Sequence, residues 1–200
     1  MPIYKRVNKD FFKKWTPEMA YVLGFFAADG TMIKNNRGAC FIEFHITDKD
    51  ILIDIKKALD SDHKISVRDR GDNYKLGYRL QIGSKEIFND LINLGFTQNK
   101  SNTLLFPDIP AKYLAHFVRG YFDGDGCVYF KKHKVKDRKN PKWIFSSRFT
   151  SGSKDFLQTL HNNQQCFLLS HTSSVAGMSP TYYEECQTTK EDCEYIYNNV

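Results

Sequence analysis

The feature of this 200-residue chain that most constrains its fold is a nine-residue segment that occurs twice. Residues 22–30 read VLGFFAADG and residues 118–126 read VRGYFDGDG, so that five of the nine positions are identical. Weaker echoes keep the same order, with residues 47–52 resembling 150–157 and residues 84–86 resembling 189–191. A repeat of about a hundred residues, present twice, predicts two similar subdomains rather than a solenoid.

Each copy predicts an apolar helix that packs closely against the other. Small residues stand four apart in both copies and form a flat strip on which two backbones can approach. These small residues are Gly24, Ala28, Gly120 and Gly124. Both copies end in Asp-Gly, so the packing would bring Asp29 and Asp125 to one seam. Two carboxylates at helix C-termini repel each other and the helix dipoles, and a divalent cation relieves that repulsion.

The first half of the chain predicts the element order α-β-β-α-β-β-α. Thr16-Pro17-Glu18 has the signals of a helix start, and Gly30 ends that helix. Residues 41–47 and 78–82 alternate apolar and polar side chains, which is typical of a sheet with one wet face. Apolar stripes over residues 51–59 and 87–92 predict two amphipathic helices.

The second half predicts a similar course. A helix is expected after Pro110, a strand over residues 143–149 and a helix from Phe156. We therefore expect an α+β protein with subdomains at residues 1–106 and 111–200, joined by a linker at 107–110. The chain stops four residues after Ile196, so the second subdomain is expected to lack the last helix of the first.

Composition favours a polyanionic partner. The net charge is +6, and the residues between 131 and 142 are rich in lysine and arginine, which suggests a loop that contacts phosphates. The sequence has no apolar run of the roughly 18 residues that a membrane span needs, and no secretory signal. The five cysteines contain no C-x-x-C pair and are read as reduced. We expect a cytoplasmic protein of bacterial or phage origin, or an organellar one.

The paired segments resemble the motifs of the LAGLIDADG homing endonucleases in their single-chain, two-motif form. Residues 117–126 are especially similar to the second motif of that family, and residues 94–101 followed by Phe106-Pro107 resemble the segment that precedes it. The resemblance implies two pseudo-symmetric αββαββα subdomains with antiparallel saddle-shaped sheets and the motif helices at their interface. It also implies a monomer that cuts both strands of a long, asymmetric DNA site.

The resemblance further implies which residues act. Asp29 and Asp125 would bind Mg²⁺, or another divalent cation such as Mn²⁺, together with the backbone carbonyls of Ala28 and Gly124. Lys100 is the best candidate for positioning water or phosphate, with Asp48 and Lys49 behind it. The wet strand faces and the basic segment would bind DNA. The candidate DNA-binding residues are Glu43, His45, Arg68, Arg70, Lys75, Arg79, Gln81, Lys131, Lys132, Lys134 and Arg148.

Two alternatives stay open on the same scaffold: an intron-RNA-binding maturase, and a DNA-binding regulator that no longer cuts. Retention of both Asp29 and Asp125 favours the enzyme, because a pure binding protein has no need of two opposed acids. Ala27 replaces an acid of the family's first motif, whereas Asp123 keeps it in the second. The chain lacks the terminal residues of intein splicing blocks, which favours a free-standing, intron-borne type.

Overall fold

The computed structural model of the chain describes residues 5–69, 71, 75–133, 142–171 and 193–198. Two compact units are formed, the first from residues 1–100 and 107–124 and the second from residues 101–106 and 125–200. The boundaries predicted at residues 106 and 110 concern the sequence repeat and stay a prediction. In the part of the chain that is described, no helix is both long and apolar enough to cross a bilayer.

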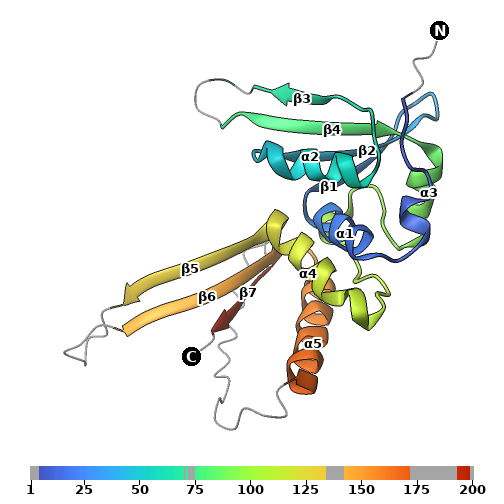
Figure 1. The fold of residues 1–200 in the computed structure, drawn as a ribbon. Helices are drawn as coiled ribbons and strands as arrows, with labels where there is room; N and C mark the ends of the chain where they lie inside the picture. Colours follow the sequence, from blue (N-terminus) through green and yellow to red (C-terminus); the bar gives the residue numbers. More distant parts are fainter. Residues whose placement is uncertain (1–4, 70, 72–74, 134–141, 172–192, 199–200) are drawn as a thin grey trace. The chain divides into compact units, whose positions relative to one another are not determined.

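The first unit contains the full α-β-β-α-β-β-α order that the sequence predicts (Figure 1). Its elements are η1 (Phe11–Lys13), α1 (Pro17–Asp29), β1 (Gly30–Lys34), β2 (Cys40–Ile46), α2 (Lys49–Ala58), β3 (Ile65–Arg68), β4 (Gly77–Gly83) and α3 (Lys85–Asn93), followed by η2 (Lys100–Asn102) and α4 (Ala111–Asp125). The last residue of α4 and the last two of η2 belong to the second unit. The α+β class is therefore confirmed.

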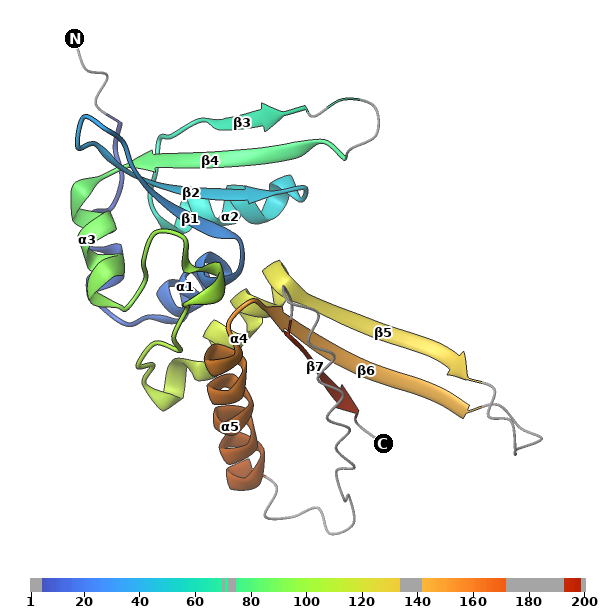
Figure 2. The ribbon, with the colours of Figure 1, turned by 180° about the vertical axis from the view of Figure 1, so that it is seen from behind.

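The first sheet is antiparallel with the strand order β1-β2-β4-β3 (Figure 2). Side chains alternate across it as expected, because Ile42 and Phe44 on β2 and Leu80 and Ile82 on β4 are fully buried. Helices α1, α2 and α3 pack on this apolar face. The other face carries the polar residues of the same strands and is left uncovered by these helices within the unit.

Side-chain caps set the starts of the helices. The Thr16 hydroxyl accepts a hydrogen bond from the backbone N–H of Met19 at 3.1 Å, and Pro17 occupies the first helical position of α1. Asp48 caps α2 through the N–H of Asp50, at 3.0 Å. Each cap satisfies a donor that the first helical turn leaves without an intrahelical partner.

Gly30 ends α1 for a steric reason rather than a conformational one. Its φ of −83° and ψ of 151° are open to any residue. However, a Cβ at this position would lie 2.1 Å from the ring of Phe26 and 2.5 Å from its carbonyl oxygen. The chain can turn directly from α1 into β1 only because no side chain is present at Gly30.

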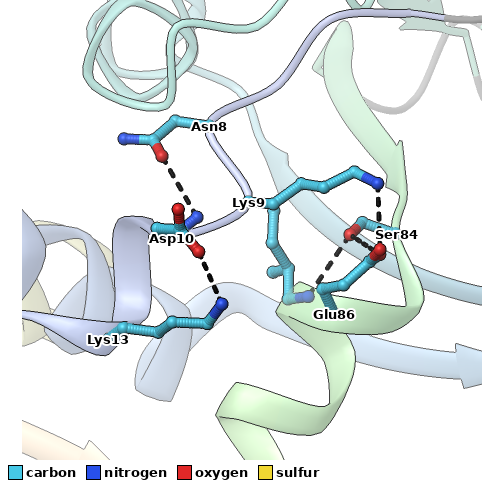
Figure 3. Close-up of polar contacts among 7 residues, drawn as sticks. Asn8, Lys9, Asp10, Lys13, Ser84 and Glu86 are labelled. Atoms are coloured by element: carbon cyan, nitrogen blue, oxygen red, sulfur yellow. Dashed lines mark hydrogen bonds and ion pairs between the residues drawn. The ribbon is translucent and has the colours of Figure 1, made fainter.

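The N-terminal segment of the first unit contacts the start of α3. Lys9 donates to the carboxylate of Glu86, at the start of α3, over 2.9 Å, and the Ser84 hydroxyl donates to the other oxygen of Glu86 at 3.1 Å (Figure 3). Ser84 also caps α3 by accepting from the N–H of Ile87. Residues 8–13 are thereby held against α3.

The second unit contains β5 (Gly126–His133), β6 (Lys142–Ser151), α5 (Lys154–His171) and β7 (Cys193–Asn198). Its strands form an antiparallel sheet in the order β5-β6-β7. Phe149 on β6 and Phe156 on α5 are buried, and the ring of Phe106 packs on that of Phe156 with centroids 5.4 Å apart. The Ser153 hydroxyl accepts from the N–H of Phe156 and so caps α5, as Asp48 caps α2 in the first repeat.

The second half of the last sequence echo lies outside the described residues. Residues 84–86 lead into the helix α3, whereas residues 189–191 lie outside the described part of the chain and are followed by the strand β7. β7 lies beside β6, which is the place that β4 holds beside β2. The equivalence suggested by the short Lys-Glu match therefore stays a prediction.

Candidate metal centre and nucleic-acid interface

The motif helices α1 and α4 meet at two glycines. A Cβ at Gly24 would lie 2.0 Å from the carbonyl oxygen of Phe117 and 2.9 Å from the backbone nitrogen of Tyr121. A Cβ at Gly120 would meet Tyr21 and Phe25 at the same two distances. The two contacts are equivalent by a local two-fold relation, and neither tolerates a side chain. The close helix contact that the glycine spacing predicts is present.

The C-terminal end of α1 lies beside the last turn of α4. A Cβ at Gly124 would lie 2.4 Å from the Cβ of Ala28 and 3.4 Å from a carboxylate oxygen of Asp29. Three of the predicted metal-site residues are thus brought together: Ala28, Asp29 and Gly124. Asp125, the fourth, follows Gly124 directly as the last residue of α4 and belongs to the second unit.

Lys100 lies at the same helix end, although it comes from η2. Its side chain is 7% exposed, and its ammonium group donates to the carbonyl oxygens of Ala27 at 2.6 Å and Ala28 at 3.2 Å. These oxygens belong to the last turn of α1, where a cation also interacts favourably with the helix dipole. Lys100 therefore stabilises the end of α1 in addition to any part in chemistry.

The donor set at this helix end suits a hard divalent cation. Mg²⁺ prefers one or two carboxylates, with water and phosphate oxygens completing an octahedron. Asp29 offers a carboxylate close to Gly124, and the carbonyl of Ala28 has a second lone pair besides the one facing Lys100. Within the described residues, no group of three or more His, Cys, Asp or Glu side chains gathers as it would in a closed, all-protein metal site.

The polar face of the first sheet gathers four predicted DNA-binding residues. Glu43 pairs with Gln81 and His45 with Arg79 in the register of β2 and β4, so all four share one face. The Gln81 amide nitrogen donates to the Glu43 carboxylate at 2.5 Å, and the Arg79 guanidinium lies 3.6 Å from the same oxygen. The Glu43 side chain is 14% exposed and that of Arg79 is 39% exposed. Glu43 is therefore more buried than Arg79, and both Arg79 and Gln81 are partly exposed.

The remaining predicted contacts are spread more widely. Arg68, on β3 opposite Gly77, shares the polar face of the first sheet and is exposed, as is Lys75 just before β4. Arg148 lies on β6 opposite Cys127 of β5. Arg70 and Lys134 lie outside the described residues.

The two ends of the basic segment 131–142 belong to strands, and residues 134–141 lie outside the described part of the chain. Residues 131–133 form the end of β5, and Lys142 begins β6. Lys131 pairs with Ile144 in the strand register. Lys132 is exposed, and strand alternation places it on the face of Phe149, opposite to the face of Arg148. Alternating apolar residues on both strands favour pairing over a solvated loop.

The sequence did not single out a polar contact between α1 and α4. The Tyr21 hydroxyl donates to the Asp123 carboxylate at 2.8 Å, and the Arg119 guanidinium lies over the Tyr21 ring at 4.9 Å from its centroid. Burial first, and then this hydrogen bond, raise the pKa of Tyr21 above its usual value of 10.0. The available signal was Asp123 itself, an acid where the first motif has Ala27.

Comparison with known proteins supports what the geometry shows. The chain matches the model of the LAGLIDADG-like domain over residues 16–93 and 112–162. It resembles the crystal structure of the I-SmaMI LAGLIDADG homing endonuclease bound to cleaved DNA, with a TM-score of 0.55 at 13% identity over 93% of this chain and 78% of that chain. The LAGLIDADG meganuclease I-CpaMI bound to uncleaved DNA gives 0.51 at 11% identity over 93% and 80%.

At these identities the likeness to solved structures shows the fold alone. No curated protein matches the chain. The family model, in contrast, covers well over half of the sequence and includes nearly all of both motif helices, the strands β1 to β6 and the first half of α5. The chain therefore belongs to the family of LAGLIDADG-like domains.

Proposed function

We propose that this protein is a sequence-specific endonuclease that hydrolyses both strands of double-stranded DNA with a divalent cation. The observation that carries the proposal is the meeting of two Asp-Gly motif helices at glycines that exclude any side chain, with the Asp29 carboxylate beside Gly124. Close packing of this kind delivers an acid at the end of each helix. DNA-bound solved structures with the same fold support the substrate class.

In this proposal Asp29, Asp125 and the carbonyls of Ala28 and Gly124 hold Mg²⁺ or Mn²⁺. The cation would polarise the scissile phosphate and lower the pKa of an attacking water. Lys100 holds the end of α1 and places a positive charge close to where a phosphate would bind. Because one chain carries both motifs, the protein would act as a monomer.

The polar face of the first sheet supplies the proposed DNA-reading surface. Arginine and glutamine match the acceptor and donor pattern that guanine and adenine present in the major groove. Arg79 and Gln81 are adjacent on one strand face and partly exposed. An antiparallel sheet of this width with its helices on the opposite face can lie along a groove without steric conflict from its own unit.

The test is cleavage of a plasmid library that carries a randomised insert, with Mg²⁺ present. The expected result is linear product whose ends define one long, asymmetric site. Asp29→Asn and Asp125→Asn should each abolish cleavage of that site and keep most of the binding, whereas Asp108→Asn, on an exposed loop, should cut normally. Full cleavage by either motif variant, or no cleavage by the unaltered protein, would contradict the proposal.

A further inference from the structure

The contact between Tyr21 and Asp123 is a side-chain hydrogen bond between α1 and α4, whereas the contacts at Gly24 and Gly120 involve backbone atoms. The Tyr21 hydroxyl donates to a carboxylate oxygen of Asp123 at 2.8 Å, across 102 residues of sequence. The ring of Tyr21 is covered by the Arg119 guanidinium, one helical turn before Asp123 on α4. Tyr21 is thus held from two positions of the same helix face.

The local two-fold relation shows that this contact exists on one side only. Tyr21 and Phe117 each stand three residues before the contact glycine of their helix, and Ala27 and Asp123 each stand three residues after it. The pair Tyr21 and Asp123 therefore holds a hydroxyl and an acid, whereas the equivalent pair Phe117 and Ala27 holds a phenyl ring and a methyl group. Phe117 and Ala27 are almost fully buried. Of the two equivalent positions, only Asp123, which faces the Tyr21 hydroxyl, is an acid.

The two motif helices are consequently held at their C-terminal ends by different groups. In α1, the carbonyls of Ala27 and Ala28 accept from Lys100. In α4, the last turn is held through the side chain of Asp123, two residues before Asp125. Asp123 and Gly124 lie in the same helical turn of the first unit, so that fixing Asp123 also fixes the backbone of Gly124.

We propose that Tyr21 and Asp123 form a latch between α1 and α4, and that these positioning residues hold the backbone carbonyl of Gly124 in place for metal binding. The metal part of this inference rests on the proposed function. The latch works through a hydrogen bond to a charged acceptor, which is stronger than a neutral one. Asp123 acts as an acceptor of this bond rather than as a metal ligand.

The variants that separate these roles are Tyr21→Phe, Asp123→Ala, the double variant and Asp123→Asn. An asparagine oxygen can still accept from the Tyr21 hydroxyl, but it carries no charge for a metal. The double variant gives the pair the same side chains as Phe117 and Ala27 have. Tyr113→Phe is the matched control, because Tyr113 lies at the start of α4 with its ring stacked on Trp15.

The first measurement is amide hydrogen exchange of the full-length protein without DNA or metal. Tyr21→Phe and Asp123→Ala should speed exchange in the last turn of α4, the double variant should exchange no faster than either single one, and Asp123→Asn should resemble the unaltered protein. Unchanged protection in both single variants, or additive losses in the double variant, would overturn the latch.

The second measurement is the Mg²⁺ concentration at half-maximal cleavage of the plasmid-selected site. Loss of the latch should raise this Mg²⁺ concentration roughly tenfold, the range in which outer partners of metal ligands act, and Asp123→Asn should keep it at the value of the unaltered protein.

An unshifted Mg²⁺ concentration despite faster exchange would overturn the positioning role and leave the latch purely structural. A loss in Asp123→Asn equal to that in Asp123→Ala would instead make the carboxylate itself essential. Failure of the unaltered protein to cleave would remove the proposed function and the metal role together, while the exchange result would still decide the latch.

Discussion

Gly24 and Gly120 make the same contact with the opposite motif helix, because a Cβ on either would lie 2.0 Å from a backbone carbonyl oxygen across the interface. Backbone atoms cannot move aside as a flexible side chain can. The distance between α1 and α4 is therefore set by the absence of two methyl groups. This relation explains why the two copies of the motif keep glycine at this position although their neighbours differ.

Alanine at either glycine should destabilise the protein substantially. Overpacking a tight contact typically costs about 1–3 kcal/mol, and the collision here involves backbone on both sides. We expect Gly24→Ala and Gly120→Ala to lower the free energy of unfolding in urea by at least this amount, and similarly to each other. Gly83→Ala is the control, since a Cβ there would meet only the ring of Phe41 at 3.3 Å. Equal stability of all three variants would show that the helices can separate freely.

Lys100 should stabilise the fold whether or not it takes part in catalysis. Lys100→Met keeps the length of the side chain and removes the donor, which leaves the carbonyls of Ala27 and Ala28 without this partner. A buried acceptor that loses its partner costs about 1–3 kcal/mol. Urea unfolding of Lys100→Met should show a loss in that range, and Lys64→Met, at an exposed lysine, should show almost none. A stable Lys100→Met variant that fails to cleave would assign the lysine to chemistry alone.

The interaction of Lys9 with Glu86 should make stability depend on pH in the acid range. The hydrogen bond from Lys9, with further bonds from the Glu86 backbone and from Ser84, lowers the pKa of Glu86 from 4.5 to about 2. A carboxyl group with a lowered pKa in the folded state stabilises the fold above pH 4.5, and this contribution is lost as the pH falls toward 2.

Glu86→Gln should remove that part of the acid dependence. The free energy of unfolding would be measured from pH 2 to pH 6 in both proteins. The unaltered protein should lose more stability on acidification than the variant, and the two curves should converge at low pH. Parallel curves over the whole range would mean that the contact in Figure 3 does not persist in solution.

The sequence predicted those parts of the structure that local rules determine. Thr16 and Pro17 gave the start of α1 correctly, and alternation placed Glu43 and Gln81 on the polar face of the sheet. The glycine spacing predicted the close contact of α1 and α4. In each case a backbone or periodicity rule acts within a few residues, so the pattern alone is sufficient.

Local rules of this kind do not predict contacts between side chains that are far apart in the sequence. Periodicity assigns Tyr21 and Asp123 to helices, but it does not give the rotation of one helix against the other, on which their hydrogen bond depends. The same holds for Lys100, whose partners lie more than seventy residues away on α1. Composition suggested a loop over residues 131–142, whereas residues 131–133 continue the strand β5, which pairs with β6.

Glu43 should organise the DNA-reading face without contacting a base itself. A carboxylate accepts hydrogen bonds only, so the Gln81 amide must direct its nitrogen toward Glu43 and leave its oxygen available outward. Arg79 is restrained by the same carboxylate. Arg79 and Gln81, the two residues proposed to contact bases, are thereby held in defined positions, which limits the entropy that they would lose on binding a base pair.

We therefore expect Glu43→Ala to relax base preference at two sites at once. Arg79→Ala and Gln81→Ala should each relax one or two base pairs, by about 1–3 kcal/mol for a bidentate contact. Glu43→Ala should affect the base pairs read by both residues and raise affinity for unrelated DNA, because it removes a negative charge from the binding face.

The readout is the profile of sites that each variant selects from the randomised library, with binding to a scrambled duplex measured at several salt concentrations. Glu86→Gln is the matched control, since its carboxylate also pairs with a basic side chain but lies on α3. Glu43→Ala would contradict this prediction if it lost base preference at one further base pair and kept the preferences that depend on Arg79 and Gln81. That outcome would show that Glu43 contacts a base directly.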